Sequence, residues 1–354
     1  MQLKRRNVLF GLMGLSLPFV ASSCAQSASQ ITANSSSGTP GSSDTTAASG
    51  SGQAPAKIRV GYQVYAGPDL LAKGLGLAKQ TFANSEVQYV QFDAGRDVNT
   101  ALAAKGIDFG VLGSVAASVG LSRNIPYDVF YIYDLTGTSE ALVVKPDIKT
   151  VADIRGKRIA VPFSSTSHFS LLSLLKLEGI SPNEVTVLDM VPPDMLAAWQ
   201  RGDIDGGYLW QPGLSKMEQD GGRVLATSGD LAKRGYATFD VAVVRREFAQ
   251  QYPEVVRQYV AMLDQAVKLY RQDPQAAAKA IAPELGLSPE ESLSQIKQYT
   301  WFDAAEQTDS KYLGTTDKPG AVAKLLKDSA DFMVAQKAIP SAPDLETVQK
   351  HIFY

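Results

Sequence analysis

The chain of 354 residues has very few of the side chains that carry metal or thiol chemistry, with one cysteine and two histidines. A structural zinc site usually needs four such ligands, and a disulfide within the chain needs two cysteines, so we expect neither. The sequence contains no Walker phosphate loop and no G-x-S-x-G nucleophile turn. It also lacks a surplus of positive charge, since 34 basic residues face 36 acidic ones, which argues against nucleic acid as a partner. We therefore expect no metal and no cofactor.

Long hydrophobic runs are missing beyond the N-terminus, so no segment of about 18 apolar residues predicts a membrane span there. The N-terminus has a basic start, an apolar stretch over residues 8–20 and then small residues before Cys24. This order is typical of a cleaved export signal, which we place at residues 1–23. Because Cys24 is the only cysteine, we expect it to be the lipidated first residue of a mature lipoprotein. An ordinary signal peptide with an incidental cysteine is the alternative, and Arg5 and Arg6 leave general and twin-arginine export both open.

After Cys24 the composition changes twice. Up to residue 56 the chain is rich in serine, threonine, glycine and alanine and offers little to bury, so we expect residues 24–56 to be a flexible tether behind the lipid anchor. From Lys57 onward, short strand patterns alternate with helical patterns, which predicts an α/β fold with mostly parallel sheets. The expected strands are KIRVGYQV, VQYVQF, FGVLGS, YDVFYIY, EALVVK, KRIAVPF, EVTVLDM, GGYLWQ and DVAVVR.

Three weak internal repeats, in the same order, predict two similar lobes. The first pairs a strand, polar loop and helix after residue 59 with the same pattern after residue 158, and the second pairs AAKGIDFGVL with WQRGDIDGGYL. The third pairs EALVVK with DVAVVR, which we expect to be the two hinge strands that connect the lobes. We therefore assign residues 57–143 and 243–354 to lobe one and 144–242 to lobe two, with a ligand cleft between them.

The segment AVPFSSTSHFSLL places a cluster of polar side chains between an apolar strand and a leucine-rich helix that ends at Gly179. In open α/β sheets, ligands bind where the strands end, and the free N–H groups of a helix N-terminus attract anions. Four hydroxyls and an imidazole exceed what a helix cap needs. We therefore expect an anion site at this turn, while a packed or orienting role for the histidine stays open. The candidates are Ser165, Thr166, Ser167 and His168.

Further candidate site residues lie where other expected strands begin or end. Gln63 lies on the loop after the first strand, Ser114 lies at a strand-to-helix turn, and Trp210 ends a strand just before a proline. Trp210 either forms a wall of the cleft or belongs to the core. Asp240 and Glu140 open the two hinge strands, where a carboxylate beside a cleft can pair with a ligand ammonium group. A turn residue for Asp240 and a surface ion pair for Glu140 are the alternatives.

The stretches SEALVVK, GKRIAVPFSSTSHFSLL, PPDMLAAWQRGDIDGGYLWQP and DVAVVRREFAQQYPEVV resemble the taurine-binding proteins of bacterial ABC importers, within the nitrate/sulfonate/taurine group. The resemblance implies a type II periplasmic binding-protein fold that closes on a ligand and delivers it to an ABC permease and its ATPase. It also implies that a sulfonate is held at the turn 165–168 and around Ser114, with Trp210 along the ligand and Asp240 on its amine. Gly67 stands where those proteins carry an acid, so another small sulfonate stays open.

The resulting hypothesis is a monomeric, lipid-anchored binding protein in the periplasm or on the extracytoplasmic face of a membrane. It captures taurine or a similar aliphatic sulfonate and is not an enzyme. One alternative is a different ligand of the same family, such as another sulfonate, a nitrate-like anion or a pyrimidine precursor. A second is a biosynthetic enzyme of related fold, and a third is a sensor that docks on a receptor. The missing cysteines and the export signal argue against the enzyme.

Overall fold

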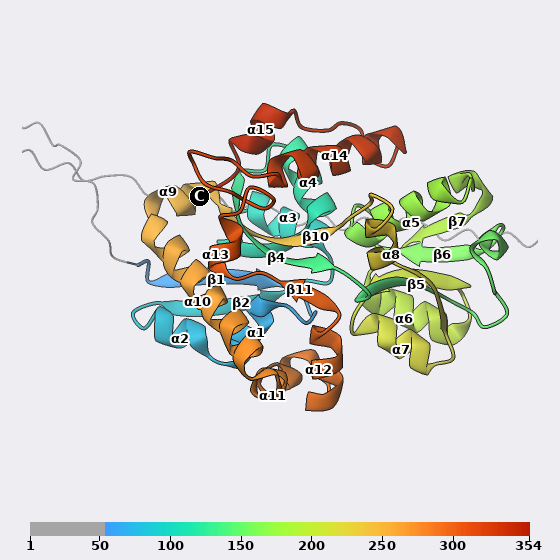
Figure 1. Cartoon of the computed structure of the whole chain (residues 1–354), viewed down its shortest axis with the longest axis horizontal. Coiled ribbons are helices and arrows are strands. Elements are labelled where there is room, and N and C mark those ends of the chain that lie inside the picture. Colours follow the sequence, from blue (N-terminus) through green and yellow to red (C-terminus); the bar gives the residue numbers. More distant parts are fainter. Residues whose placement is uncertain (1–53) are drawn as a thin grey trace, which may run out of the picture. The chain divides into compact units, whose positions relative to one another are not determined.

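The computed structural model describes residues 54–354, which form two α/β lobes with one sheet each (Figure 1). The predicted signal peptide, Cys24 and nearly all of the predicted tether lie outside the described residues. Within the described part, no helix combines the length and the apolar character that crossing a bilayer requires.

Lobe one contains a six-stranded sheet in the order β11-β4-β10-β3-β1-β2. Its strands are β1 (Lys57–Tyr62), β2 (Glu86–Gln91), β3 (Phe109–Gly113), β4 (Tyr127–Thr136), β10 (Phe239–Arg245) and β11 (Tyr299–Trp301). Its helices are α1 (Pro68–Gly74), α2 (Leu77–Thr81), α3 (Gly95–Ala103), α4 (Ser114–Ser122), α9 (Arg246–Gln251), α10 (Pro253–Gln272), α11 (Pro274–Leu285), α12 (Pro289–Ile296), α13 (Ala304–Gln307), α14 (Val322–Ala335) and α15 (Leu345–Gln349). Helix α12 begins with the capping box of Ser288 and Glu291 that its sequence predicts.

Lobe two contains a five-stranded sheet in the order β7-β6-β8-β5-β9. Its strands are β5 (Glu140–Val144), β6 (Arg158–Val161), β7 (Thr186–Asp189), β8 (Gly206–Trp210) and β9 (Arg223–Thr227). Its helices are α5 (Thr166–Leu177), α6 (Pro192–Arg201), α7 (Gly213–Gln219) and α8 (Ser228–Ala232), with short 3-10 turns at Val151–Ile154 and Pro182–Glu184. Helix α5 ends before Gly179, whose φ of 62° is the left-handed conformation expected after a helix.

The two sheets share one strand order. Read from the edge, β2-β1-β3-β10-β4 in lobe one corresponds to β7-β6-β8-β5-β9 in lobe two, and each pair of equivalent strands has the same direction within its sheet. The three sequence repeats fall on equivalent elements, namely β1 with β6, β3 with β8 and β10 with β5. The predicted similarity of the lobes is therefore confirmed.

The expectation of mostly parallel sheets is wrong, because both sheets are mixed. Strand β10 is antiparallel to β3 and to β4, and β5 is antiparallel to β8 and to β9. The reason is the way the chain changes lobes. Strands β5 and β10 each enter their sheet at the edge that faces the other lobe, whereas the strands that pair with them end at that edge, so β5 and β10 run in the opposite direction.

The chain crosses between the lobes at residues 137–139 and again at 233–238, where neither sheet contributes a strand (Figure 1). The backbone N–H of Thr136 donates to the carbonyl of Thr238 at 3.0 Å, so the two crossings lie side by side. The candidate hinge strands β5 and β10 lie within the sheets of lobe two and lobe one, respectively. The chain therefore passes from one sheet to the other before residues 143 and 242, after which the lobe boundaries were expected.

Each lobe has its own buried core on both faces of its sheet. A smaller apolar cluster joins the lobes where α4 and α14 of lobe one meet α5 of lobe two. In this cluster the ring of Phe332 lies 4.8 Å from that of Phe169 and 5.6 Å from that of Tyr236 in the second crossing. Helix α14 therefore supports the second crossing from the side of lobe one.

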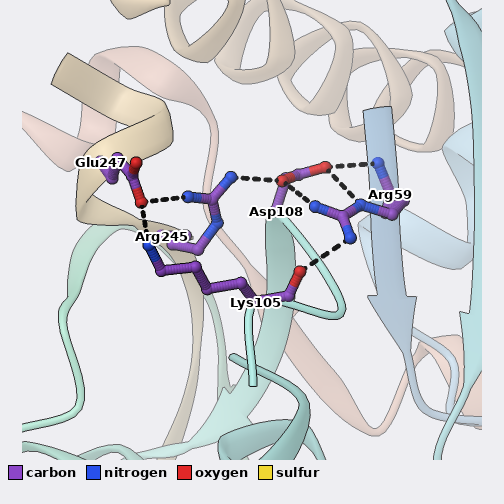
Figure 2. A network of polar contacts seen from close by, with 5 residues as sticks. All are labelled: Arg59, Lys105, Asp108, Arg245 and Glu247. Atoms are coloured by element: carbon purple, nitrogen blue, oxygen red, sulfur yellow. Dashed lines mark hydrogen bonds and ion pairs between the residues drawn. The ribbon is translucent and has the colours of Figure 1, made fainter. Parts of the chain in front are cut away.

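A network of charged residues around the buried Asp108 ties three strands of lobe one together at one edge of the sheet (Figure 2). The carboxylate of Asp108, just before β3, accepts from the Nη2 atoms of Arg59 on β1 at 2.9 Å and Arg245 at the end of β10 at 2.8 Å. Arg245 also donates to Glu247 at 3.0 Å, and Lys105 donates to the same carboxylate at 2.7 Å. Because β1 and β3 begin at this edge, it lies opposite the edge that faces lobe two.

Candidate functional site

A small cavity lies between the lobes, at the edge where β1, β3 and β8 end. It leaves about 40 Å³ for the centres of water-sized molecules, room for roughly three waters and hence for a solute of few heavy atoms. Its lining comes from both lobes and consists of Gln63, Tyr65, Gly95, Val111, Gly113, Thr136, Glu140, Ser165, Thr166, Trp210, Asp240 and Tyr299.

Three helices begin at this cavity. Gly95 is the first residue of α3, Gly113 is the N-cap of α4, and Thr166 is the first residue of α5. The first N–H groups of a helix have no acceptor within it, and its N-terminus carries a partial positive charge that favours anions by about 0.3–1 kcal/mol, up to about 2 when partly buried. Three such termini around one cavity give an anion several donors without a cationic side chain.

Two hydroxyls of the polar turn, those of Thr166 and Ser167, point toward Glu140. The two oxygens of this carboxylate accept from Thr166 at 2.6 Å, Ser167 at 2.7 Å, Ser170 at 3.3 Å and Ser228 at 2.6 Å. Burial raises the pKa of Glu140, and these four donors oppose that rise. Glu140 therefore fixes the first turn of α5 through its side-chain hydroxyls. The backbone N–H groups of Thr166 and Ser167 stay available to bind an anion.

The remaining residues of the turn hold its backbone in place. The hydroxyl of Ser165 caps α5 by accepting from the N–H of His168 at 3.2 Å and donates to the carbonyl of Pro162 at 2.6 Å. Ser164 adopts a φ of 62°, and its N–H donates to Nδ1 of His168 at 3.2 Å. The His168 ring stacks on Phe163 with centroids 4.7 Å apart. Burial lowers the pKa of His168 to about 4, so its ring is neutral at pH 7 and can accept that hydrogen bond.

The opposite side of the cavity is acidic. Asp240 on β10 pairs directly with Asp134 on β4, so the two carboxylates face each other across neighbouring strands. Burial, followed by the charges of Glu140 and Asp69, raises the pKa of Asp240 to about 7. Burial and then the charge of Asp240 raise the pKa of Asp134 well above its ordinary value. Two such carboxylates cannot both be ionised unless a cation compensates them, so either a shared proton or a ligand cation is required.

A second acidic group lies close to this pair. Asp69, in the first turn of α1, is buried, and burial raises its pKa to about 7. A side chain at Gly67 would come within 2.3 Å of the Tyr65 ring and 2.6 Å of the Asp69 carboxylate. The acid that relatives are expected to carry at position 67 therefore has no room here, and Asp69 supplies a carboxylate nearby.

Six of the predicted site residues line the cavity, and these are Gln63, Glu140, Ser165, Thr166, Trp210 and Asp240. Three others lie behind it. Ser114 is fully buried next to Gly113, and its hydroxyl has no hydrogen-bond partner within residues 54–354. Ser167 bonds to Glu140, and His168 supports the turn.

Sequence reasoning missed Asp134, Asp69 and Tyr299. Asp134 is the one acid in the inward half of an otherwise apolar strand, YIYDLT, which is a signal for a buried carboxylate, but its pairing with Asp240 needs the strand register. Asp69 reads as an ordinary acid in the first turn of a helix. Tyr299 belongs to β11, a strand of three residues that its sequence does not distinguish from the end of the preceding helix.

The chain is similar to several proteins of known class. Residues 81–277 match the protein family described as NMT1/THI5 like. Over 293 residues the chain is 37% identical to the taurine-binding periplasmic protein of Escherichia coli (strain K12), a match that covers 80% of this chain and 88% of that protein. It is 26% identical over 296 residues to a putative aliphatic sulfonates-binding protein of the same organism, with 82% and 88% covered.

Among solved structures, the alkanesulfonate-binding protein SsuA from Xanthomonas axonopodis pv. citri, bound to MOPS, superposes with a TM-score of 0.71. The two chains are 25% identical, and the match covers 85% of this chain and 99% of that one. This likeness confirms the predicted two-lobed periplasmic binding-protein fold, in which the cavity described above lies between the lobes.

Proposed function

This chain belongs to the NMT1/THI5-like family, and from that premise we propose that it is an extracytoplasmic solute-binding protein for taurine or a similar small aliphatic sulfonate. Binding is non-covalent. The helix N-termini and the turn 165–168 hold the sulfonate, Asp240 holds the ammonium group, and closure of the lobes buries the ligand.

The observation that carries this proposal is the opposite polarity of the two sides of the cavity. A Cβ atom on Gly113 would lie 2.8 Å from Cγ2 of Thr166, at the start of α5, and 3.4 Å from Oδ1 of Asp240. The donors of the helix termini and the carboxylate therefore lie close to each other. A zwitterion whose anionic and cationic ends are joined by a short spacer fits both at once, whereas nitrate or a plain alkanesulfonate leaves the acidic pair without a cation.

The proposed partners follow from the relatives. Two of the similar proteins are named as periplasmic binding proteins, and the name of one of these two also states an ABC transporter. We propose that this chain delivers its ligand to an ABC permease and its ATPase, and that lipid attached to Cys24 keeps it at the membrane while residues 25–56 give it reach. The folded part acts as a monomer.

Calorimetry with the purified protein tests the proposed function. We expect saturable one-to-one binding of taurine, weaker binding of ethanesulfonate, which lacks the ammonium group, and no turnover of either ligand. Weaker binding of taurine than of ethanesulfonate would contradict the role of the acidic pair. Chemical conversion of the ligand would favour an enzyme instead.

One ion pair holds the lobes together at the cleft. Arg96, in the first turn of α3, places Nη1 at 2.5 and 2.7 Å from the two carboxylate oxygens of Asp189 at the end of β7. Of the ion pairs within residues 54–354, this is the one that joins the two lobes. Asp189 also accepts the backbone N–H of Phe163 at 3.0 Å, so the pair is linked to the turn that holds the anion.

We expect Arg96→Ala to speed the release of taurine about five-fold, because a partly exposed pair contributes up to about 1 kcal/mol to the closed state. The rate of association should change little. Stopped-flow measurement of tryptophan fluorescence checks both rates, since Trp210 lines the cavity. Arg155→Ala is the matched control, because Arg155 forms a similarly exposed pair with Glu184 within lobe two. Equal effects of the two substitutions would contradict the assignment.

The raised pKa values of the acidic pair predict that taurine binding depends on pH. Without ligand, the pair retains a proton near and below pH 7, because the pKa of Asp240 is raised to about 7. An alkylammonium ion replaces that proton, so binding releases it, and affinity falls as pH falls through the raised pKa. We expect about ten-fold weaker binding at pH 6 than at pH 8.

The groups that face Asp240 are Asp134, Asp69, Glu140, Tyr65 and Tyr299, and the carboxyls among them share the same direction of pKa shift. Calorimetry in two buffers of different ionisation heat measures the protons released. In Asp240→Asn the dependence on pH should shrink. Constant affinity from pH 8 to pH 6 would show that the carboxylate is already charged without ligand.

A further inference from the structure

The apolar cluster that joins the lobes is formed by two of the three helices that begin at the cavity, together with α14. We call it the interlobe cluster. Its helical members are Val115 and Val119 of α4, Phe169 and Leu172 of α5, and Ala330 and Met333 of α14. The members from α4 and α5 lie within the first two turns of these helices. Each lobe therefore contributes one helix that has its N-terminus at the cavity and, close behind it, one side of the interlobe cluster.

Helix α5 is fixed to both lobes at once. Leu171, Leu174 and Leu175 pack in the core of its own lobe. Phe169 and Leu172 are buried against α4 and α14 of lobe one. Detaching α5 from lobe one would expose these two side chains to water, and full exposure of one such side chain shifts an equilibrium by about ten-fold or more. Separation of the lobes at the interlobe cluster is therefore strongly disfavoured.

Helix α14 is an integral part of lobe one. Its first half packs in the core of that lobe through Val322 and Leu326, and the hydroxyl of Ser118 on α4 lies 2.7 Å from the carbonyl oxygen of Leu326. Its second half reaches the second crossing, where the ring of Phe332 contacts that of Tyr236. The interlobe cluster therefore adjoins one of the two segments about which the lobes turn, and parts of a molecule near a rotation axis move least.

The contact at the opposite end of the cleft is of a different kind. Arg96 follows β2 and Asp189 ends β7, and in each sheet this is the edge strand farther from the strand, β10 or β5, that adjoins the crossings. Water can serve both partners of this partly exposed ion pair when the lobes part. Between the two ends, the half-buried ring of Trp210 also contacts the core of lobe one. Opening is therefore easiest at Arg96 and Asp189.

Resting on the proposed function, we propose that the interlobe cluster is a pivot that stays closed when the cleft opens. The lobes part at the end of Arg96 and Asp189, and the first turns of α4 and α5 remain together in the ligand-free protein. The tight contact in which a Cβ atom on Gly113 would lie 2.8 Å from Cγ2 of Thr166 is then kept in the open form. The anion site is preformed across the two lobes, and closure covers a ligand that is already held there.

Thiol labelling of the full chain with a maleimide tests the pivot. The thiol introduced by Leu172→Cys lies in the interlobe cluster, so we expect it to react equally slowly without ligand and with saturating taurine. The thiol introduced by Arg96→Cys should react more slowly once taurine is bound, because closure brings it against Asp189. The unsubstituted protein measures any reaction of Cys24. Faster labelling of Leu172→Cys without taurine than with it would overturn the inference.

A change in α14 gives a second test, in the background of Leu172→Cys and without ligand. Phe332→Ala should raise the labelling rate about ten-fold, because labelling follows the population of the separated state and the ring packs against Phe169. Phe332→Leu keeps an apolar side chain and should restore slow labelling. Leu325→Ala, on the exposed face of α14, is the control and should change nothing. Equal rates in Phe332→Ala and Leu325→Ala would contradict the role of α14.

Thermal unfolding shows whether each variant is folded, and Val119→Cys, on the α4 side of the interlobe cluster, takes the place of Leu172→Cys if that variant does not fold. Calorimetry separates the pivot from the proposed function. If the unsubstituted protein does not bind taurine, the proposed function is wrong. If it binds taurine and the cluster thiol responds to the ligand, the proposed function stands and the pivot is wrong. Unchanged labelling at both ends of the cleft would show that the lobes do not part, which also overturns the pivot.

Discussion

Replacing Asp240 with asparagine should weaken taurine binding about 100-fold, because removing the charge of a buried, hydrogen-bonded ion pair costs about 2–5 kcal/mol. Asp240 is the carboxylate of the acidic pair that lines the cavity, where we propose that the ammonium group binds. Asparagine keeps the size of the side chain and one acceptor oxygen, which limits the change to the charge. Titration calorimetry at pH 8, where the wild-type carboxylate is ionised, measures the loss.

The same substitution should leave the affinity for ethanesulfonate unchanged or raise it slightly, since this ligand has no ammonium group and is repelled by a carboxylate. Asp93→Asn removes an exposed carboxylate just after β2 that does not line the cavity, and it should change the affinity for both ligands by less than two-fold. Equal losses for taurine and ethanesulfonate in Asp240→Asn would show that the residue shapes the cavity and does not recognise the amine.

Replacing Asp108 with alanine should lower the free energy of unfolding by about 3 kcal/mol, because it removes the buried carboxylate that pairs with the largely buried guanidinium group of Arg245 and with that of Arg59. The side chain of Asp108 is 2% exposed, and that of its partner Arg245 is 12% exposed. Asp108 also accepts the backbone N–H of Arg59 at 2.9 Å, so the change removes a hydrogen bond that fixes the start of β1 (Figure 2). Urea unfolding followed by circular dichroism measures the loss.

Glu247→Ala is the control, because it removes a carboxylate from the same network whose side chain is 61% exposed. Exposed ion pairs contribute about 0–1 kcal/mol, so the loss should be correspondingly small. The network lies at the edge of the sheet opposite the cleft, and both variants should bind taurine normally at a temperature where they are folded. A similar loss of stability in the two variants would contradict the role assigned to burial.

The two-lobed fold could be predicted because most strands and helices show their own apolar pattern in the local sequence. Nine strands carry apolar patterns of four or more residues bounded by turn residues, and long amphipathic helices such as Pro253–Gln272 repeat their apolar residues at helical spacing. Two strands were missed. β9 has the sequence RVLAT and no fully buried residue, and β11 has three residues. The direction of β5 and β10 was also missed, since it depends on where the chain enters each sheet.

The position of the site could be predicted better than its hydrogen bonds. Ser165 and Thr166 could be predicted because strand ends and helix starts mark the edge of a sheet where ligands bind, and Asp240 because it opens an expected hinge strand. The acceptor of the hydroxyls of Thr166 and Ser167 could not be found in this way. Their acceptor, Glu140, lies 26 and 27 residues earlier in the chain and reaches them only after β5 has paired with β8.

The continuity of lobe two has a consequence for the order in which the lobes fold. All five of its strands and all four of its helices lie between residues 140 and 232, whereas the sheet of lobe one needs β10 and β11, which are translated later. Domains generally fold as units as the chain emerges. The N-terminal half of lobe one must therefore wait, with one edge of β3 unpaired, while the segment translated after it finishes folding first.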